Sequence, residues 1–187
     1  PALPVGSYAY SQGLEQVVEA QWVTDADSLQ QWLQGLMHGS IYSVDLPIIR
    51  RLYRAWSARE LDDVQHWNDI ALAYRETSEL RKEELDKGHA LSALLSGLEL
   101  PAAVFLQQLQ SPTFLAGYSA AAVDWQIELS AAMEAYVWAW LENQVVSAMK
   151  IMPLGQQAGQ KILSRLISDI PSLVADALQL EDEAIGP

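Results

Sequence analysis

The chain has 187 residues, of which 50% are apolar, 24 are acidic, 11 are Lys or Arg and none is Cys, and its net charge is -13. The apolar content is high enough for a buried core, so it excludes an intrinsically disordered chain. The acidic charge repels phosphate, so we expect no nucleic-acid partner. The lack of Cys excludes disulfides, thiolate metal sites, iron–sulfur clusters and Cys nucleophiles.

Two features bear on the location of the protein. Residues 1–6 contain neither a basic segment nor an apolar run, so we expect no secretory leader. Residues 100–123 carry no charge, but they include three Gln and two Pro. We interpret this segment as buried protein, because a spanning helix needs about 20 predominantly apolar residues. We expect a cytoplasmic protein without membrane contact.

The pattern of apolar residues predicts an all-α fold. Apolar residues recur at spacings of three and four, and alternating strand patterns are lacking. We predict a first helix over 12–21 and a second one capped by Asp25 or Asp27. A third helix is predicted to begin at residues 45–47, because Pro47 fits a first helical turn.

The remaining helices follow from capping and proline signals. Ser57 and Glu60 have the spacing of a capping box, which predicts the start of a fourth helix. The fifth covers about 78–98, and its i,i+4 charge pairs (Lys82 with Asp86, Glu83 with Lys87) predict a solvated face or, alternatively, a partner surface. Further helices are predicted over 101–110, after Ser111-Pro112, over 130–151 and on both sides of Pro171, ending near Leu180. We therefore predict one single-domain bundle of about eight to ten helices over 1–187, with a short acidic end at about 181–187.

Lys150 is isolated, because 62 residues without Lys or Arg precede it. Such a cation either pairs internally or faces a carboxylate or phosphate of a partner. Gly155 and Gly159 follow at the start of a helix, one turn apart. We expect them to allow close helix packing; a phosphate cradle is the alternative, although the Lys-Ser/Thr ending of a Walker motif is missing.

Candidate catalytic and metal-binding residues are sparse. His38, His66 and His89 are scattered, and Asp62 with His66 and Asp86 with His89 form pairs that lack the further ligands of a metal site. Trp125, Tyr136, Trp138 and Trp140 have helical spacing, and we expect them to pack in the core. A cavity lined by these aromatic residues, and thus a helical enzyme, is the alternative.

Four blocks of sequence resemble one family. They are residues 3–15 (LPVGSYAYSQGLE), 45–47 (DLP), 75–81 (RETSELR) and 150–160 (KIMPLGQQAGQ). In this order they resemble the urease accessory protein UreF family. Family members usually also have a basic C-terminal tail that orders on binding UreD, and we expect this tail to be missing here.

The resemblance implies an all-α protein that is not an enzyme. Members of the family bridge the accessory protein UreD (UreH in some species) to the GTPase UreG, support GTP-dependent nickel insertion into apo-urease, and form homodimers. No tightly bound cofactor is implied, because nickel is in transit through the complex. A purely structural helical dimer remains a further alternative.

The resemblance also implies roles for particular residues. Lys150, Pro153, Gly155 and Gln156 correspond to a GTPase-facing block. The other matching positions are expected to be structural or to lie in an interface, with ion pairs that hold the N-terminal segment against the helices; they are Tyr8, Tyr10, Gly13, Glu15, Arg75, Glu79, Arg81 and Gly159.

Overall fold

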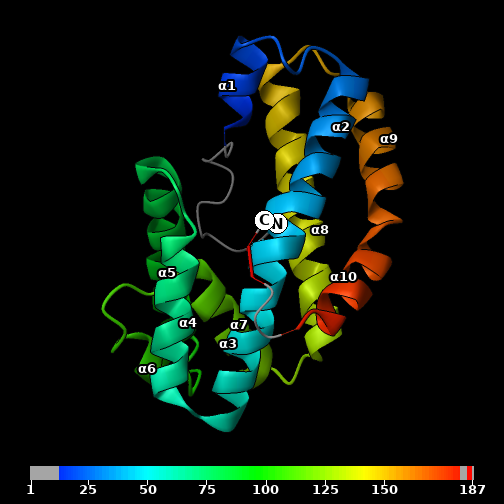
Figure 1. Ribbon diagram of the computed structural model, residues 1–187. Coiled ribbons are helices and arrows are strands. Elements are labelled where there is room, and N and C mark those ends of the chain that lie inside the picture. Colours follow the sequence, from blue (N-terminus) through cyan, green and yellow to red (C-terminus); the bar gives the residue numbers. More distant parts are fainter. Residues whose placement is uncertain (1–12, 182–184, 187) are drawn as a thin grey trace.

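A computed structural model describes residues 13–181 and 185–186, and Tyr8 and Tyr10 lie outside this part of the chain. The described residues form ten α-helices and one π-helix and contain no strand (Figure 1). The predicted all-α bundle of about eight to ten helices is confirmed. The helices are α1 (Leu14–Glu19), α2 (Ala26–Leu36), η2 (Met37–Asp45, the π-helix), α3 (Leu46–Ala58), α4 (Leu61–Ala73), α5 (Ser78–Gly97), α6 (Ala103–Leu106), α7 (Phe114–Asp124), α8 (Leu129–Ile151), α9 (Gln156–Ile167) and α10 (Ile170–Gln179).

The predicted helix start at 45–47 is confirmed, since α3 begins at Leu46 with Pro47 in its first turn. No break separates this helix from the second predicted helix, however. The π-helix η2 joins α2 to α3, and the Leu46 N–H bonds to the carbonyl five residues back, at Ile41. Pro47 has no N–H to donate to the Ser43 carbonyl, four residues earlier. That carbonyl instead accepts the Gly186 N–H at 2.9 Å. A contact from the far end of the chain thus supports the helix at its proline.

The predicted caps have different outcomes. Asp25 caps α2, since its carboxylate accepts the Ser28 N–H at 2.8 Å. The capping box at Ser57 and Glu60 is wrong. The Ser57 hydroxyl donates to the Tyr53 carbonyl at 2.8 Å within α3, and α4 begins at Leu61 without a side-chain cap.

Small residues allow α7 to lie against α3 in the core. Ala116, Gly117, Ala120 and Ala121 of α7 are buried, and Trp56 of α3 donates its indole N–H to the Ala116 carbonyl at 3.1 Å. The uncharged segment 100–123 was interpreted as buried protein, and the burial of these residues confirms this for the part that forms α7. The described helices include none that combines the length and apolar character of a membrane span.

The helices expected over 101–110 and around Pro171 begin or end at other residues than predicted. The helix expected over 101–110 is reduced to the single turn α6. The break near Pro171 is confirmed, but it falls at 168–169, and Pro171 lies in the first turn of α10.

Buried Arg50 of α3 donates to the carbonyls of Leu178 and Leu180 at 2.9 and 2.8 Å, which binds the end of α10 to the core.

Candidate functional site

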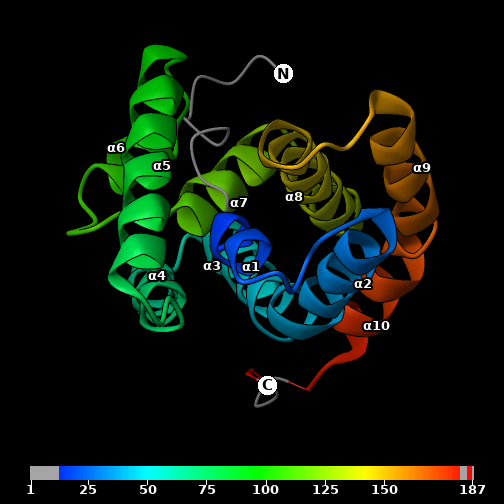
Figure 2. The same ribbon diagram turned by 90° about the horizontal axis from the view of Figure 1, so that it is seen from above.

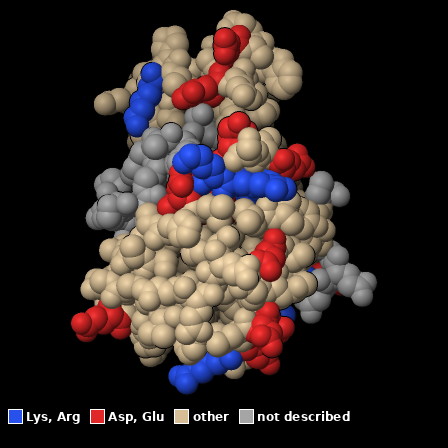
Figure 3. All heavy atoms as spheres, turned by 90° about the vertical axis from the view of Figure 1, so that its left-hand side faces the viewer, with Lys and Arg blue, Asp and Glu red and all other residues tan. Residues whose placement is uncertain are grey.

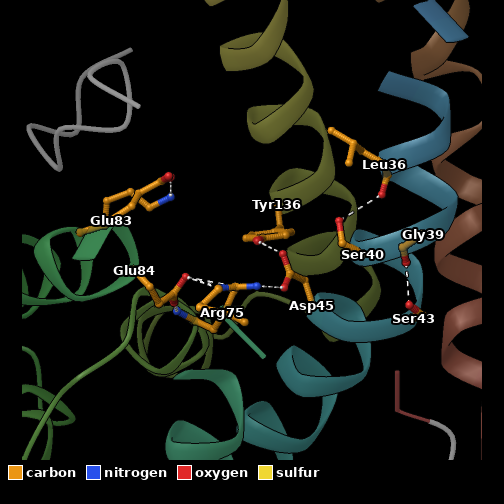
Figure 4. A network of polar contacts seen from close by, with 11 residues as sticks. Leu36, Gly39, Ser40, Ser43, Asp45, Arg75, Glu83, Glu84 and Tyr136 are labelled. Carbon is orange, nitrogen blue, oxygen red and sulfur yellow. Dashed lines mark hydrogen bonds and ion pairs between the residues drawn. The ribbon is translucent and has the colours of Figure 1, made fainter. Parts of the chain in front are cut away.

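A buried cluster of charges lies where η2, α5 and α8 meet (Figure 4). The Arg75 guanidinium, in the turn between α4 and α5, contacts the Asp45 carboxylate at 2.8 Å and the Glu84 carboxylate at 3.0 Å. The side chains of Arg75, Asp45 and Glu84 are only 14%, 6% and 5% exposed. One guanidinium therefore forms ion pairs with two carboxylates from different helices inside the protein.

Two further helices are bound to this cluster. The Tyr136 hydroxyl of α8 donates to Asp45 at 2.6 Å. The Glu84 carboxylate accepts the Leu115 N–H of α7 at 3.1 Å, near the positive end of that helix. Because all partners are buried, the interactions depend on one another.

The cluster shifts the protonation equilibria of its members. Burial opposes the charge of Arg75, but Asp45 and Glu84 outweigh this effect and raise the pKa of Arg75 well above its ordinary value. Burial also opposes the charge of Glu84, but Arg75, Lys87 and the Leu115 N–H lower its pKa. Burial and the Asp45 charge raise the pKa of Tyr136 well above its ordinary value. At neutral pH Glu84 is therefore ionised, Arg75 is protonated and Tyr136 is a neutral phenol.

A pocket of about 300 Å³ lies beside the cluster. Its polar wall contains Arg75, Glu84, Glu83 and Lys87, and its apolar wall contains Leu36, Ile41, Val44, Tyr136 and Trp140. The Glu83–Lys87 pair, at 2.8 Å, was expected on a solvated face; this is wrong, because both side chains are largely buried and the Lys87 ammonium lies over the Phe114 ring. The Lys82–Asp86 pair is exposed as expected.

The four aromatic residues that were expected to pack in the core differ in burial. Tyr136 and Trp140 are four residues apart in α8 and buried, which confirms core packing for them. For Trp138 and Trp125 the expectation is wrong, since both are exposed. Trp138 lies on the opposite side of α8, and Trp125 lies directly after the end of α7.

The acid stability of the protein is expected to depend on Glu84. Because the folded state lowers its pKa below the ordinary 4.5, Glu84 contributes stability above that pH and loses it as the pH falls through the folded-state pKa. The urea midpoint of the wild type should therefore fall steeply below pH 4.5, and that of Glu84→Gln less steeply. Tryptophan fluorescence at each pH measures both midpoints; parallel curves would contradict the assignment.

The predicted GTPase-facing block lies at one end of the bundle. Lys150 is exposed in the last turn of α8, where a cation is favoured, and Pro153, Gly155 and Gln156 are exposed in the connection to α9 and at its start. The close packing expected at Gly155 is wrong, since nothing lies within 4 Å of where its Cβ would be. It is confirmed at Gly159, whose Cβ would be 2.9 Å from the Met149 sulfur of α8.

The other matching positions have separate local roles. Gly13 precedes α1 with φ 86°, a conformation that favours glycine, and Glu15 is exposed in the first turn. Glu79 is exposed, and hydrogen bonds from its own N–H and from Ser78 lower its pKa. The Arg81 guanidinium donates to the Arg75 carbonyl at 2.7 Å. The contacts of Arg75 join η2 to α5, while the expected attachment of the N-terminal segment lies outside the described residues.

The sequence analysis did not identify Glu84 as a site residue, and it predicted packing for Tyr136 but not its hydrogen bond to Asp45. A signal for Glu84 exists in its spacing, because it shares a helix face with Gly88, Leu91 and Leu95, all buried. A carboxylate on such a face needs a buried cation. No comparable signal marks Tyr136, whose partner is 91 positions away.

The histidines lie apart from the cluster. His66 and His89 are exposed, with Asp62 and Asp86 exposed on the same helices. Over residues 13–181 and 185–186, no three His, Asp or Glu side chains are arranged to hold a metal ion.

Comparison with known proteins identifies the family. The model of the UreF family matches residues 23–167. Urease accessory protein UreF of Alcanivorax borkumensis is 41% identical over all of this chain and 84% of its own length. The proteins of the same name from Alkalilimnicola ehrlichii and Teredinibacter turnerae are 43% and 44% identical over the whole chain and 82% and 84% of their lengths. The chain belongs to the UreF family of urease accessory proteins.

Proposed function

We propose that this protein acts in urease maturation as an adaptor that bridges UreD (or UreH) to the GTPase UreG and so supports GTP-dependent nickel insertion into apo-urease. The observation that carries the proposal is family membership along the whole chain, with relatives named urease accessory protein UreF. Nickel is cargo in this process and is not held as a tight cofactor. The protein works in the cytoplasm and as a homodimer.

The exposed residues of the block at 150–156, Lys150, Pro153, Gly155 and Gln156, suit the GTPase contact. The block combines an ammonium group at the end of α8 with the start of α9, whose first N–H groups have no side-chain cap. Both features favour an acidic or phosphate-bearing partner surface. In a chain with a net charge of -13, a placed cation also sets the orientation in which such a partner docks.

A catalytic role for the pocket is less well supported. The carboxylates of Asp45 and Glu84 are held by Arg75, and the Tyr136 hydroxyl donates to Asp45. Each group is therefore committed to another group of the cluster, and a general base has to be available for substrate. We propose that the cluster is structural and that the protein is not an enzyme.

Lys150→Ala is expected to weaken recruitment of UreG by about tenfold or more, the loss typical of a charged hydrogen bond at an interface. The measurement is co-purification of UreG with UreD and this protein, followed by titration. Far-ultraviolet circular dichroism should be unchanged, because Lys150 is exposed. Lys161→Ala, which removes another exposed base on α9, is the matched control and should bind as the wild type does.

Two outcomes would count against these assignments. If neither UreD nor UreG associates with the wild-type protein at micromolar concentration, the adaptor role is wrong. If Lys150→Ala unfolds the protein, Lys150 is structural.

A further inference from the structure

Trp22 is the most exposed large apolar residue in the part of the chain that the structure describes, with 71% of its surface accessible. An indole on a flexible loop could turn away from water, but this one lies on an ordered turn. The N–H groups of Trp22 and Val23 both donate to the Val17 carbonyl, at 2.9 and 3.2 Å, and Gln21 has φ 62°. Val23 is buried directly after it. Hydrogen bonds therefore fix the backbone of this turn, and the Trp22 side chain that it carries is exposed.

This turn lies at the same end of the bundle as Lys150. In Figure 1 the connection from α1 to α2 and the connection from α8 to α9 are both at the top of the molecule, and the view from above in Figure 2 shows both on the near side. α1 packs against α8 and α2 against α9. The two connections thus lie at the same end of the helical bundle.

We propose that Trp22 is the apolar anchor of the partner-binding surface that also contains Lys150. The inference rests on the proposed function, in which the occupant of this surface is the GTPase. Interface hot spots are enriched in Trp because the ring buries a large area while losing little conformational freedom. A fixed backbone lowers the entropic cost of binding further.

The charges around Trp22 specify the chemistry of the partner. Glu19 and Asp25 are exposed on either side of the turn, and the Ser28 N–H lowers the pKa of Asp25, so this side is negative. Lys150 provides the positive charge. A complementary surface has an apolar pocket for the indole, a basic group beside the pocket, and an acidic group or phosphate opposite Lys150.

Other exposed apolar side chains lack such a pattern. Leu98, Val104 and Phe105 are exposed near the end of α5 and on α6. The face that carries α5 and α6 has a wide area without Lys, Arg, Asp or Glu (Figure 3). Such a surface offers no charge with which to orient a partner. Val104, 61% exposed, is therefore a matched control for Trp22.

The test is a titration of UreG into the complex of UreD with the full chain, using the wild type and the variants Trp22→Ala, Trp22→Phe and Val104→Ala. Trp22→Ala should weaken binding by about 30-fold, as expected of a hot-spot residue. Trp22→Phe should recover most of the affinity, and Val104→Ala should bind as the wild type does. The emission spectrum of Trp22 is obtained by subtracting the spectrum of Trp22→Phe from that of the wild type. Its maximum should shift to shorter wavelength when UreG binds, because the indole then leaves water. Thermal unfolding checks that each variant is folded.

The outcomes separate the two proposals. If the wild-type chain does not bind UreG in the presence of UreD, both the adaptor role and the anchor role are overturned. If the wild type binds but Trp22→Ala binds as tightly as Val104→Ala, only the anchor role is overturned. If Trp22→Ala and Val104→Ala both weaken UreG binding by the same factor, the anchor role is likewise overturned, because the loss of affinity is then not specific to Trp22.

Discussion

Arg75→Ala is expected to destabilise the fold by about 3–5 kcal/mol, which is the usual cost of removing one partner from a buried ion pair. The substitution removes the guanidinium that contacts both Asp45 and Glu84, whose side chains are only 6% and 5% exposed. Asp45 then lacks its ion-pair partner, and Glu84 keeps only the weaker effect of Lys87. The substitution also removes the link between η2 and α5. Urea unfolding, followed by tryptophan fluorescence, measures the change in the free energy of unfolding.

Three further variants test whether the loss of stability in Arg75→Ala comes from the buried ion pairs. Arg81→Ala removes an exposed guanidinium that bonds to the same turn, and it should cost much less. Arg75→Lys keeps the charge but cannot contact both carboxylates with a planar fork, so its loss should be intermediate. The triple change Asp45→Asn, Arg75→Met and Glu84→Gln should recover much of the stability, because it buries no charge. An Arg75→Ala loss no larger than that of Arg81→Ala would contradict the role of the cluster.

Gly88→Ala is expected to destabilise the protein by about 3 kcal/mol, at the upper end of the range for overpacking. A Cβ at this position would be 2.0 Å from the Pro112 carbonyl oxygen and 2.7 Å from the Thr113 carbonyl carbon. These are backbone atoms that lead into α7, so no side-chain rotation relieves the clash. The helix α5 must move away from α7, which also weakens the bond from Leu115 to Glu84.

Two other glycines provide graded controls for this measurement. At Gly159 the nearest atom to a Cβ is the Met149 sulfur, the flexible part of a side chain, so Gly159→Ala should cost less, about 1 kcal/mol. At Gly35, inside α2, nothing lies within 4 Å. There alanine should stabilise the protein by about 0.5–1 kcal/mol through its better helix propensity. Equal effects at Gly88 and Gly159 would show that α5 and α7 adjust freely.

The candidate site could be predicted only in part. Lys150 was identified from its isolation in the sequence, and the structure places it on the surface. The buried cluster was not predicted, because Asp45 and Tyr136 meet across 91 positions and the local patterns to which they belong do not indicate this contact. The exposed ion pair expected at Glu83 and Lys87 is local, but its burial depends on the α7 residue Phe114 that covers Lys87.

Local patterns in the sequence were sufficient to predict the helical class, the positions of most helices, the cap at Asp25 and the family. These properties follow from short-range periodicity, from backbone bonds within a few residues and from motif blocks. The folded structure was needed to show that η2 joins α2 to α3 without a break, that the Gly186 N–H bonds to the Ser43 carbonyl beside Pro47, and that Arg75 pairs with two buried carboxylates. The reason is physical: a buried polar group must find a partner wherever the packed chain brings one, and that partner is often remote in sequence.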